Sequence, residues 1–140
     1  METMKKIRYF IPMFIWMLFI FLMSQTNGND SSSQSNFIVD IIIKIINIDH
    51  DTLSLIVRKC AHFTEYTILA FLIYYGLAKN QVNNKSILLY TVLITFAYAC
   101  SDEFHQLFIN GRSGQFKDVL IDTSGVIFIC LWHYLKKSKS

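Results

Sequence analysis

Three ionisable side chains near the middle of the chain have types and a spacing suited to ligand binding or proton transfer. Arg58, His62 and Glu65 stand at positions i, i+4 and i+7, so on a helix they line one face. The helix that they would open continues into an apolar segment long enough to cross a bilayer. Ionisable groups in such a segment are costly and are kept mainly where they face a protein interior or a wet cavity. The pattern therefore predicts a polar site between membrane helices.

The composition favours a membrane protein. Of the 140 residues, 53% are hydrophobic and only 16% are charged, whereas a soluble domain carries about 25% charged residues. The Lys and Arg residues do not gather into a stripe that would follow nucleic acid, so we expect no nucleic-acid partner. Cys60, Cys100 and Cys130 lie in apolar segments without a CxxC spacing, which is typical of small residues in packed helices.

The apolar segments predict an all-α membrane protein with one domain over residues 1–140. Four transmembrane helices are expected at about 7–23, 56–78, 87–108 and 118–135. Between the first two, an Ile-rich stretch has polar residues at helical spacing and is too short to span. It predicts an interfacial helix at about 37–48, although its β-branched content leaves a strand open. The first apolar run exceeds a signal-peptide core and lacks a cleavage site, so we expect it to stay attached.

The basic residues in the short flanks predict that both termini lie inside. This orientation leaves eight of the 13 Lys and Arg residues on the inner side: Lys5, Lys6, Arg8, Lys79, Lys85, Lys136, Lys137 and Lys139. Helix rise then puts Glu65, Asp102 and Asp122 about 20, 22 and 20 Å from the inner boundary. Because the hydrocarbon core is about 30 Å thick, three helices are predicted to carry carboxylates at one level in its outer third.

Two further helix faces support this convergence. Asp102 and Gln106 share a face at i, i+4, and Glu103 lies about 100° around the same helix. Asp118, Asp122, Gly125 and Ile129 form a stripe in which Gly125 would let another helix approach closely. We predict that these faces meet in one outward-facing polar site. Its members are Arg58, Lys59, His62, Glu65, Asp102, Glu103, Gln106, Arg112, Asp118 and Asp122.

At these residues the chain resembles the VanZ-like family of small bacterial membrane proteins. Three blocks carry the resemblance: Arg58-Lys59-x-x-His62-Phe63-x-Glu65-Tyr66-x-x-Leu69, Asp102-Glu103-x-x-Gln106-x-Phe108-x-x-Gly111-Arg112 and Asp118-Val119-x-x-Asp122-x-x-Gly125. Ser24-Gln25 at the end of the first apolar segment also fits. The chain departs from the family pattern where Asn110 replaces a frequent Pro, Asp122 a frequent Asn, and Ile129 a frequent second Gly.

The resemblance implies a multi-pass protein of the bacterial cytoplasmic membrane and cell envelope. The named member of the family is associated with low-level resistance to glycopeptide antibiotics, teicoplanin in particular. A contribution of this chain to antibiotic resistance is therefore an expectation by analogy. The expected partners are the lipid bilayer and an envelope lipid, a wall precursor or a glycopeptide.

Several interpretations of the polar site stay open. It could be an internal ion-pair network that fixes helix docking, although the acids outnumber the bases and would need protonation, a cation or a ligand. The favoured interpretation is head-group binding. Arg58, Lys59 and Arg112 would hold a phosphate or carboxylate, because the Arg fork matches planar anions. Gln106, Asp118 and Asp122 would complete the binding residues.

An enzyme is the main alternative. His62, Glu65, Asp102 and Glu103 are candidate catalytic residues for acid/base chemistry on a lipid-linked phosphate. No nucleophile elbow, P-loop or HExxH motif is present, so whether a reaction is catalysed stays open.

Metal binding and transport are less favoured. His62, Glu65, Asp102, His105 or Asp118 have ligand chemistry, but no spacing specifies a metal, so we predict neither a metal nor a cofactor. Four helices are few for a transporter, and the polar groups stop at one depth.

Overall fold

The structure is a computed structural model that describes residues 7–25, 39, 42, 49–110, 112 and 114–138. Every regular element within these ranges is helical, and none of the described residues is in a strand. The elements are η1 (Arg8–Phe10), α2 (Ile11–Ser24), α4 (His50–Lys79), α5 (Asn84–Gln106), α6 (Phe116–Ser124) and α7 (Val126–Ser138). The predicted all-α class is confirmed. The interfacial helix predicted at 37–48 lies outside the described residues, apart from Val39 and Ile42.

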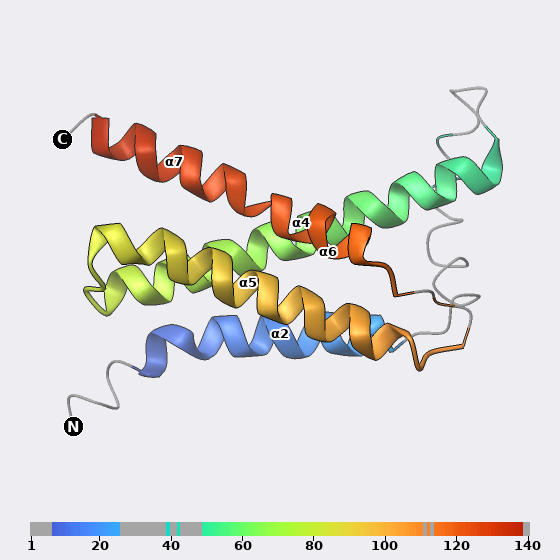
Figure 1. Ribbon diagram of the computed structural model, residues 1–140, viewed down its shortest axis with the longest axis horizontal. Coiled ribbons are helices and arrows are strands. Elements are labelled where there is room, and N and C mark those ends of the chain that lie inside the picture. Colours follow the sequence, from blue (N-terminus) through green and yellow to red (C-terminus); the bar gives the residue numbers. More distant parts are fainter. Residues whose placement is uncertain are drawn as a thin grey trace.

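The helices form an antiparallel bundle (Figure 1). The directions of α2, α4, α5 and the α6–α7 pair alternate, so both termini lie at one end of the bundle. The end of α2, the start of α4, the end of α5 and the start of α6 lie at the other end. The central helix is α4, which contacts α2, α5, α6 and α7. Its 30 residues correspond to about 45 Å at the α-helical rise, and its first turns extend beyond the neighbouring helices.

Local sequence accounts for several helix ends. Pro12 lies in the first turn of α2, where its missing N–H has no helical partner to lose. The Asp49 side chain caps α4 by accepting the backbone N–H of Thr52 at 3.2 Å. Gly125 separates α6 from α7, and its own backbone is right-handed helical. The last predicted span, 118–135, is thus two helices with a break at this glycine.

Two stretches are both long and apolar enough to cross a membrane, Ser86–Gln106 and Phe116–Lys136. They correspond to the spans predicted at 87–108 and 118–135. The span predicted at 7–23 coincides with α2, where the apolar stretch Arg8–Ser24 is shorter. The span predicted at 56–78 falls in α4, and its first half carries charged residues that lower the mean hydropathy. The membrane character of the chain is therefore supported directly by two of the four predicted spans.

The apolar core follows one face of the second half of α4. Tyr66, Leu69, Ala70 and Ile73 are completely buried, and their spacing of three and four residues is that of one helical face. Side chains from the other helices pack against them, namely Ile20, Ile87, Ala99, Val126 and Ile129. This core holds the far half of the bundle together and leaves the first half of α4 to face polar partners.

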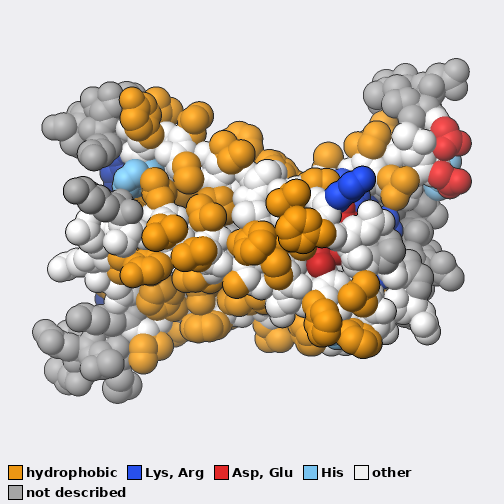
Figure 2. All heavy atoms as spheres, viewed as in Figure 1, with side chains coloured by type: hydrophobic (Ala, Val, Ile, Leu, Met, Phe, Trp, Pro, Cys, Tyr) orange, Lys and Arg blue, Asp and Glu red, His pale blue; other side chains and the backbone are white. Residues whose placement is uncertain are grey.

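The outer surface of the bundle is strongly apolar. Leu18 and Leu22 on α2, Leu93 on α5 and Ile127 on α7 are each more than half exposed. Figure 2 shows that hydrophobic side chains cover the middle of the bundle, whereas the visible Asp and Glu gather toward the end where α4 begins. An apolar surface of this kind, called here the apolar belt, is suited to lipid and unsuited to water.

Candidate functional site

A polar cavity of about 330 Å³ lies at the end of the bundle where α4 begins. Four parts of the chain form it: the first half of α4, the end of α5, the loop that follows α5, and α6. Its lining is Leu55, Arg58, Lys59, His62, Glu103, Gln106, Arg112, Gln115, Asp118 and Asp122. All of these except Leu55 and Gln115 belong to the polar site predicted from the sequence, so the predicted convergence of helix faces does occur.

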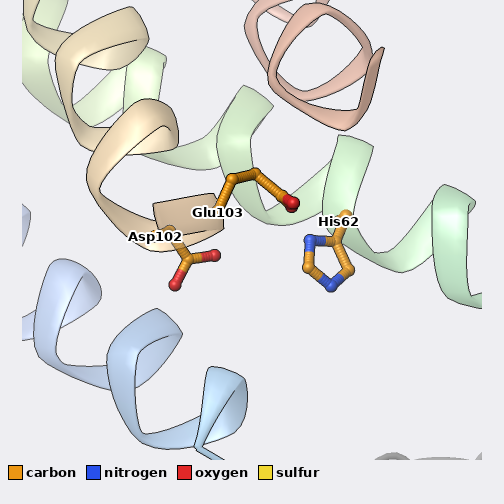
Figure 3. Close-up of side chains that lie close together, drawn as sticks. All are labelled: His62, Asp102 and Glu103. Carbon is orange, nitrogen blue, oxygen red and sulfur yellow. The ribbon is translucent and has the colours of Figure 1, made fainter. Parts of the chain in front are cut away.

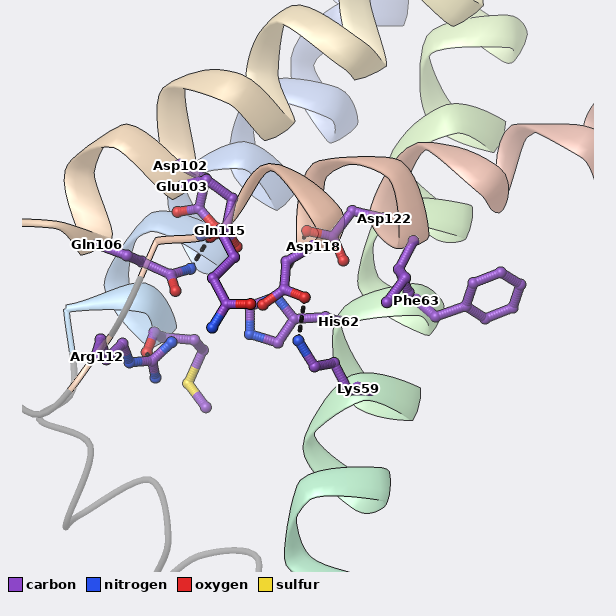
Figure 4. Close-up of polar contacts among 12 residues, drawn as sticks. Lys59, His62, Phe63, Asp102, Glu103, Gln106, Arg112, Gln115, Asp118 and Asp122 are labelled. Carbon is purple, nitrogen blue, oxygen red and sulfur yellow. Dashed lines mark hydrogen bonds and ion pairs between the residues drawn. The ribbon is translucent and has the colours of Figure 1, made fainter. Parts of the chain in front are cut away.

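Two contacts join α4 to α6 across the cavity (Figure 4). The Lys59 ammonium pairs with the Asp118 carboxylate. Because the Lys59 side chain is 35% exposed, we expect this pair to contribute only about 0–1 kcal/mol. One turn deeper, His62 Nδ1 lies 3.7 Å from Asp122 Oδ2, and the Asp122 side chain is 1% exposed. The pairing of acids on α6 with bases on α4 fixes which face of each helix meets the cavity.

The loop after α5 is held against the end of that helix by Glu103. The Glu103 Oε2 atom accepts the backbone N–H of Gln115 at 2.9 Å. A Cβ atom on Gly114 would lie only 2.2 Å from the backbone oxygen of Glu103, so the loop can pass this close only with glycine at that position. This close passage brings Arg112 and Gln115 to the cavity, although neither belongs to a helix.

Arg112 connects the loop to the end of α2. Its Nη2 atom donates to the backbone oxygen of Met23 at 3.3 Å, in the last turn of α2, where carbonyl groups lack helical partners. Burial lowers the pKa of the Arg112 guanidinium from its ordinary value, and the nearby charge of Arg58 lowers it further, whereas nearby acids, among them Glu103, oppose the shift. Two guanidinium groups from different elements therefore face one cavity.

Two buried carboxylates have oxygen atoms without a hydrogen-bond partner among the described residues. Asp102 and Asp122 are 4% and 1% exposed, and the atoms without a hydrogen bond are Asp102 Oδ1 and Asp122 Oδ2, although the latter lies 3.7 Å from His62 Nδ1. The other Asp102 oxygen accepts from Gln106 Nε2 at 3.1 Å. The buried Tyr66 hydroxyl lies beside Asp102, also without a hydrogen bond of normal geometry. Buried polar atoms normally have partners, so these atoms single out the cluster as a candidate site.

Two predicted members of the site, Glu65 and Asp102, do not line this cavity. Glu65 lies one turn deeper along α4 than His62, in electrostatic contact with His62 and Asp102, and its backbone oxygen accepts from Trp16 Nε1 at 2.9 Å. Asp102 faces a second cavity of about 250 Å³ that Phe21 also lines. The three carboxylates predicted at one depth all lie near His62. Asp122 lines the large cavity, whereas Glu65 and Asp102 do not.

Sequence reasoning missed Gln115 and Tyr66 as members of the cluster. Gln115 lies in an irregular loop and contributes through its backbone, so no periodic pattern marked it. Tyr66 stands four residues after His62, a spacing that places it on the same side of α4, and this signal would have found it. His105, considered as a metal ligand, instead packs its ring on Phe21 with centroids 5.0 Å apart.

Gly125 lies in close contact with α4, as its position in the stripe with Asp118 and Asp122 predicted. A Cβ atom at this position would lie 2.2 Å from Thr67 Oγ1 and 3.1 Å from the Thr67 Cα atom. The chain at the α6–α7 break therefore rests directly on the backbone of α4. This contact holds Asp122, three residues earlier, against His62.

The bundle has an apolar outer surface, two helices long and apolar enough to cross a bilayer, and a polar cavity at one end, and these features together indicate a helical membrane protein. The VanZ/LLP1 family model matches residues 9–136, nearly the whole chain, and the chain belongs to this family. The resemblance seen in its polar motifs is thereby confirmed. No curated protein and no solved structure matches the chain significantly.

Proposed function

We propose that this protein binds the anionic head group of an amphiphilic molecule in the outer leaflet. The observation that carries the proposal is the approach of Arg58 and Arg112 to one cavity from α4 and from the loop after α5. Two like charges facing a shared space repel each other, and an anion between them would relieve the repulsion. The guanidinium fork matches the oxygen geometry of a phosphate or a carboxylate.

The candidate ligands are an envelope lipid, a lipid-linked wall precursor and a glycopeptide of the teicoplanin type. Membership of the VanZ/LLP1 family supports a role in the cell envelope, and the association of the family's named member with teicoplanin supports the drug as one candidate. A contribution to antibiotic resistance is part of the proposal by analogy. All three ligand types combine an apolar tail with an acidic group, which suits a polar cavity beside an apolar belt.

A titration of the purified full-length protein in neutral detergent tests the proposal. Its arms are short-chain phosphatidylglycerol, short-chain phosphatidylcholine, glycerol phosphate and teicoplanin. We expect saturable binding of phosphatidylglycerol or teicoplanin, weaker binding of glycerol phosphate, and no saturable binding of phosphatidylcholine. Saturable binding of phosphatidylcholine as tight as that of phosphatidylglycerol would overturn the proposal, because it would leave no role for the anionic group. Saturable binding of neither phosphatidylglycerol nor teicoplanin would overturn it as well.

The proposal includes four membrane spans with both termini inside. Support comes from the antiparallel bundle, in which both termini lie at the end opposite the cavity. We expect a membrane-impermeant maleimide to label Asn110→Cys in intact cells and Gln81→Cys only after permeabilisation, in a background where Cys60, Cys100 and Cys130 are replaced by serine. The reverse labelling pattern would contradict this orientation.

Acid/base catalysis on a lipid-linked phosphate is the second candidate. The observation that favours it is the partly buried His62, which lines the cavity and has a carboxylate oxygen of Asp122 3.7 Å from its Nδ1 atom. A neighbouring carboxylate can orient an imidazole for proton transfer. Arg58 and Arg112 would then hold the phosphate while its charge develops.

Complementation of a deletion strain under glycopeptide stress tests this second candidate. We expect His62→Ala and Asp102→Asn to lose the phenotype while inserting into the membrane at wild-type levels. Full complementation by both variants would contradict catalysis through these residues. It would leave head-group binding standing, because that proposal is tested by the titration of phosphatidylglycerol.

A further inference from the structure

We infer that His62, Asp102 and Glu103 form a binding site for a divalent metal ion of the Zn²⁺ type. One ligand atom from each of the three side chains lies within 4.8 Å of the other two. Figure 3 shows the imidazole of α4 and the two carboxylates of α5 directed toward a common space. Asp102 and Glu103 are 4% and 5% exposed, so this is a buried cluster and not a group of solvated acids.

A second observation indicates that the cluster takes a cation. Asp102 Oδ1 is buried and makes no hydrogen bond of normal geometry with the described residues, not even with the Tyr66 hydroxyl beside this carboxylate, while Oδ2 accepts from Gln106. The nearby ammonium of Lys59 is already paired with Asp118. A bare carboxylate oxygen in the interior is costly unless a positive partner satisfies it. A metal ion between Asp102, Glu103 and His62 would supply that partner.

The geometry suits an ion that accepts nitrogen and oxygen ligands together. Zn²⁺ binds both at about 2.0–2.2 Å, so its ligand atoms stand about 3–4 Å apart, and the three side chains would close by about an ångström around it. An imidazole ligand disfavours Mg²⁺, which prefers oxygen ligands and water. His62 and Glu103 also line the large cavity, so the coordination position that three protein ligands leave open would face it.

Two neighbours are placed to orient the ligands. Gln106 donates to Asp102 Oδ2 at 3.1 Å, and Asp122 Oδ2 lies 3.7 Å from His62 Nδ1. Residues in these positions typically hold metal-binding side chains in a productive orientation. The inference departs from the sequence prediction of no metal, because two adjacent acids and a histidine 40 residues away make no recognisable ligand spacing.

The test uses the full-length protein in neutral detergent, purified without a histidine tag and stripped with a chelator. Zn²⁺ is then titrated in the presence of excess Mg²⁺, and bound metal is measured by mass spectrometry. We expect one Zn²⁺ per chain, with affinity reduced about a hundredfold or more in His62→Ala and Asp102→Asn, since even the loss of an orienting neighbour costs 10- to 100-fold. No lipid is present, so this result is independent of the proposed head-group binding.

Matched controls remove the same chemical groups elsewhere. His133→Ala takes a histidine from α7, where it contacts Tyr74, and Asp51→Asn takes an exposed acid from the first turn of α4. Both variants should bind Zn²⁺ like the wild type. Circular dichroism checks that every variant is folded, and Co²⁺ added to the wild-type protein should give the absorption bands of mixed nitrogen and oxygen ligation. Absence of stoichiometric Zn²⁺ in the wild type, or equal loss in His133→Ala and His62→Ala, would overturn the inference.

Discussion

Replacing Arg58 or Arg112 with alanine is expected to weaken the binding of short-chain phosphatidylglycerol about 10- to 100-fold. Each guanidinium would contribute a charge-assisted hydrogen bond to the anionic group, and such bonds contribute about 1.5–3 kcal/mol. The two variants differ in their expected side effects. Arg112 also donates to the Met23 carbonyl, so Arg112→Ala should lower thermal stability as well, whereas Arg58→Ala should leave it near the wild-type value.

Two comparisons separate a specific site from general attraction between basic protein and acidic lipid. Arg8→Ala removes the same charge at the opposite end of the bundle, where Arg8 contacts Tyr9, and should leave the affinity unchanged. Arg58→Lys keeps the charge but loses the planar fork, so its affinity should fall between those of the wild type and Arg58→Ala. A loss in Arg8→Ala equal to that in Arg58→Ala would show that the cavity does not provide the binding site.

The second large effect concerns the contact between α4 and the α6–α7 break. We expect Gly125→Ala to lower the free energy of unfolding by about 1–3 kcal/mol, the usual cost of inserting atoms into a packed interface. The added Cβ would lie 2.2 Å from Thr67 Oγ1, so α4 and the break must separate. Thermal unfolding of the purified protein in detergent measures this loss of stability. Because the separation would also displace Asp122 from the cavity, ligand binding there should weaken as well.

A second substitution tests whether the contact with Thr67 causes the destabilisation of Gly125→Ala. Thr67→Ala removes the hydroxyl that the new Cβ would meet, so the double variant should recover part of the stability that Gly125→Ala loses. Gly76→Ala is the comparison for a clash with a movable group, because its Cβ would meet the Phe10 ring at 2.6 Å. Gly76→Ala should therefore lower the free energy of unfolding by less than Gly125→Ala does. Equal or smaller destabilisation by Gly125→Ala would show that this close approach does not hold the helices together.

The sequence alone determined the helical class, the membrane character and most members of the polar site. These follow from local patterns: apolar runs of sufficient length predict helices for a bilayer, and spacings of three and four residues put Arg58 with His62, and Asp118 with Asp122, on single helix faces. The polar residues were also distinctive enough in combination to indicate the family. Two of the four predicted spans were supported directly. Charged residues lower the mean hydropathy of α4, and the apolar stretch Arg8–Ser24 that contains α2 is too short.

Only the tertiary structure decided which of the polar residues line the large cavity and which lie outside it. The rotation of each helix about its own axis depends on contacts between residues far apart in the chain, such as Gly125 against Thr67. This rotation turns Glu65 and Asp102 away from the lining of the large cavity. The path of the loop depends on Gly114 passing over Glu103, which brought Arg112 and Gln115 to the lining. The grouping of His62 with Asp102 and Glu103 joins residues far apart in the chain. Local periodicity contains no information about such contacts, because it describes one helix at a time.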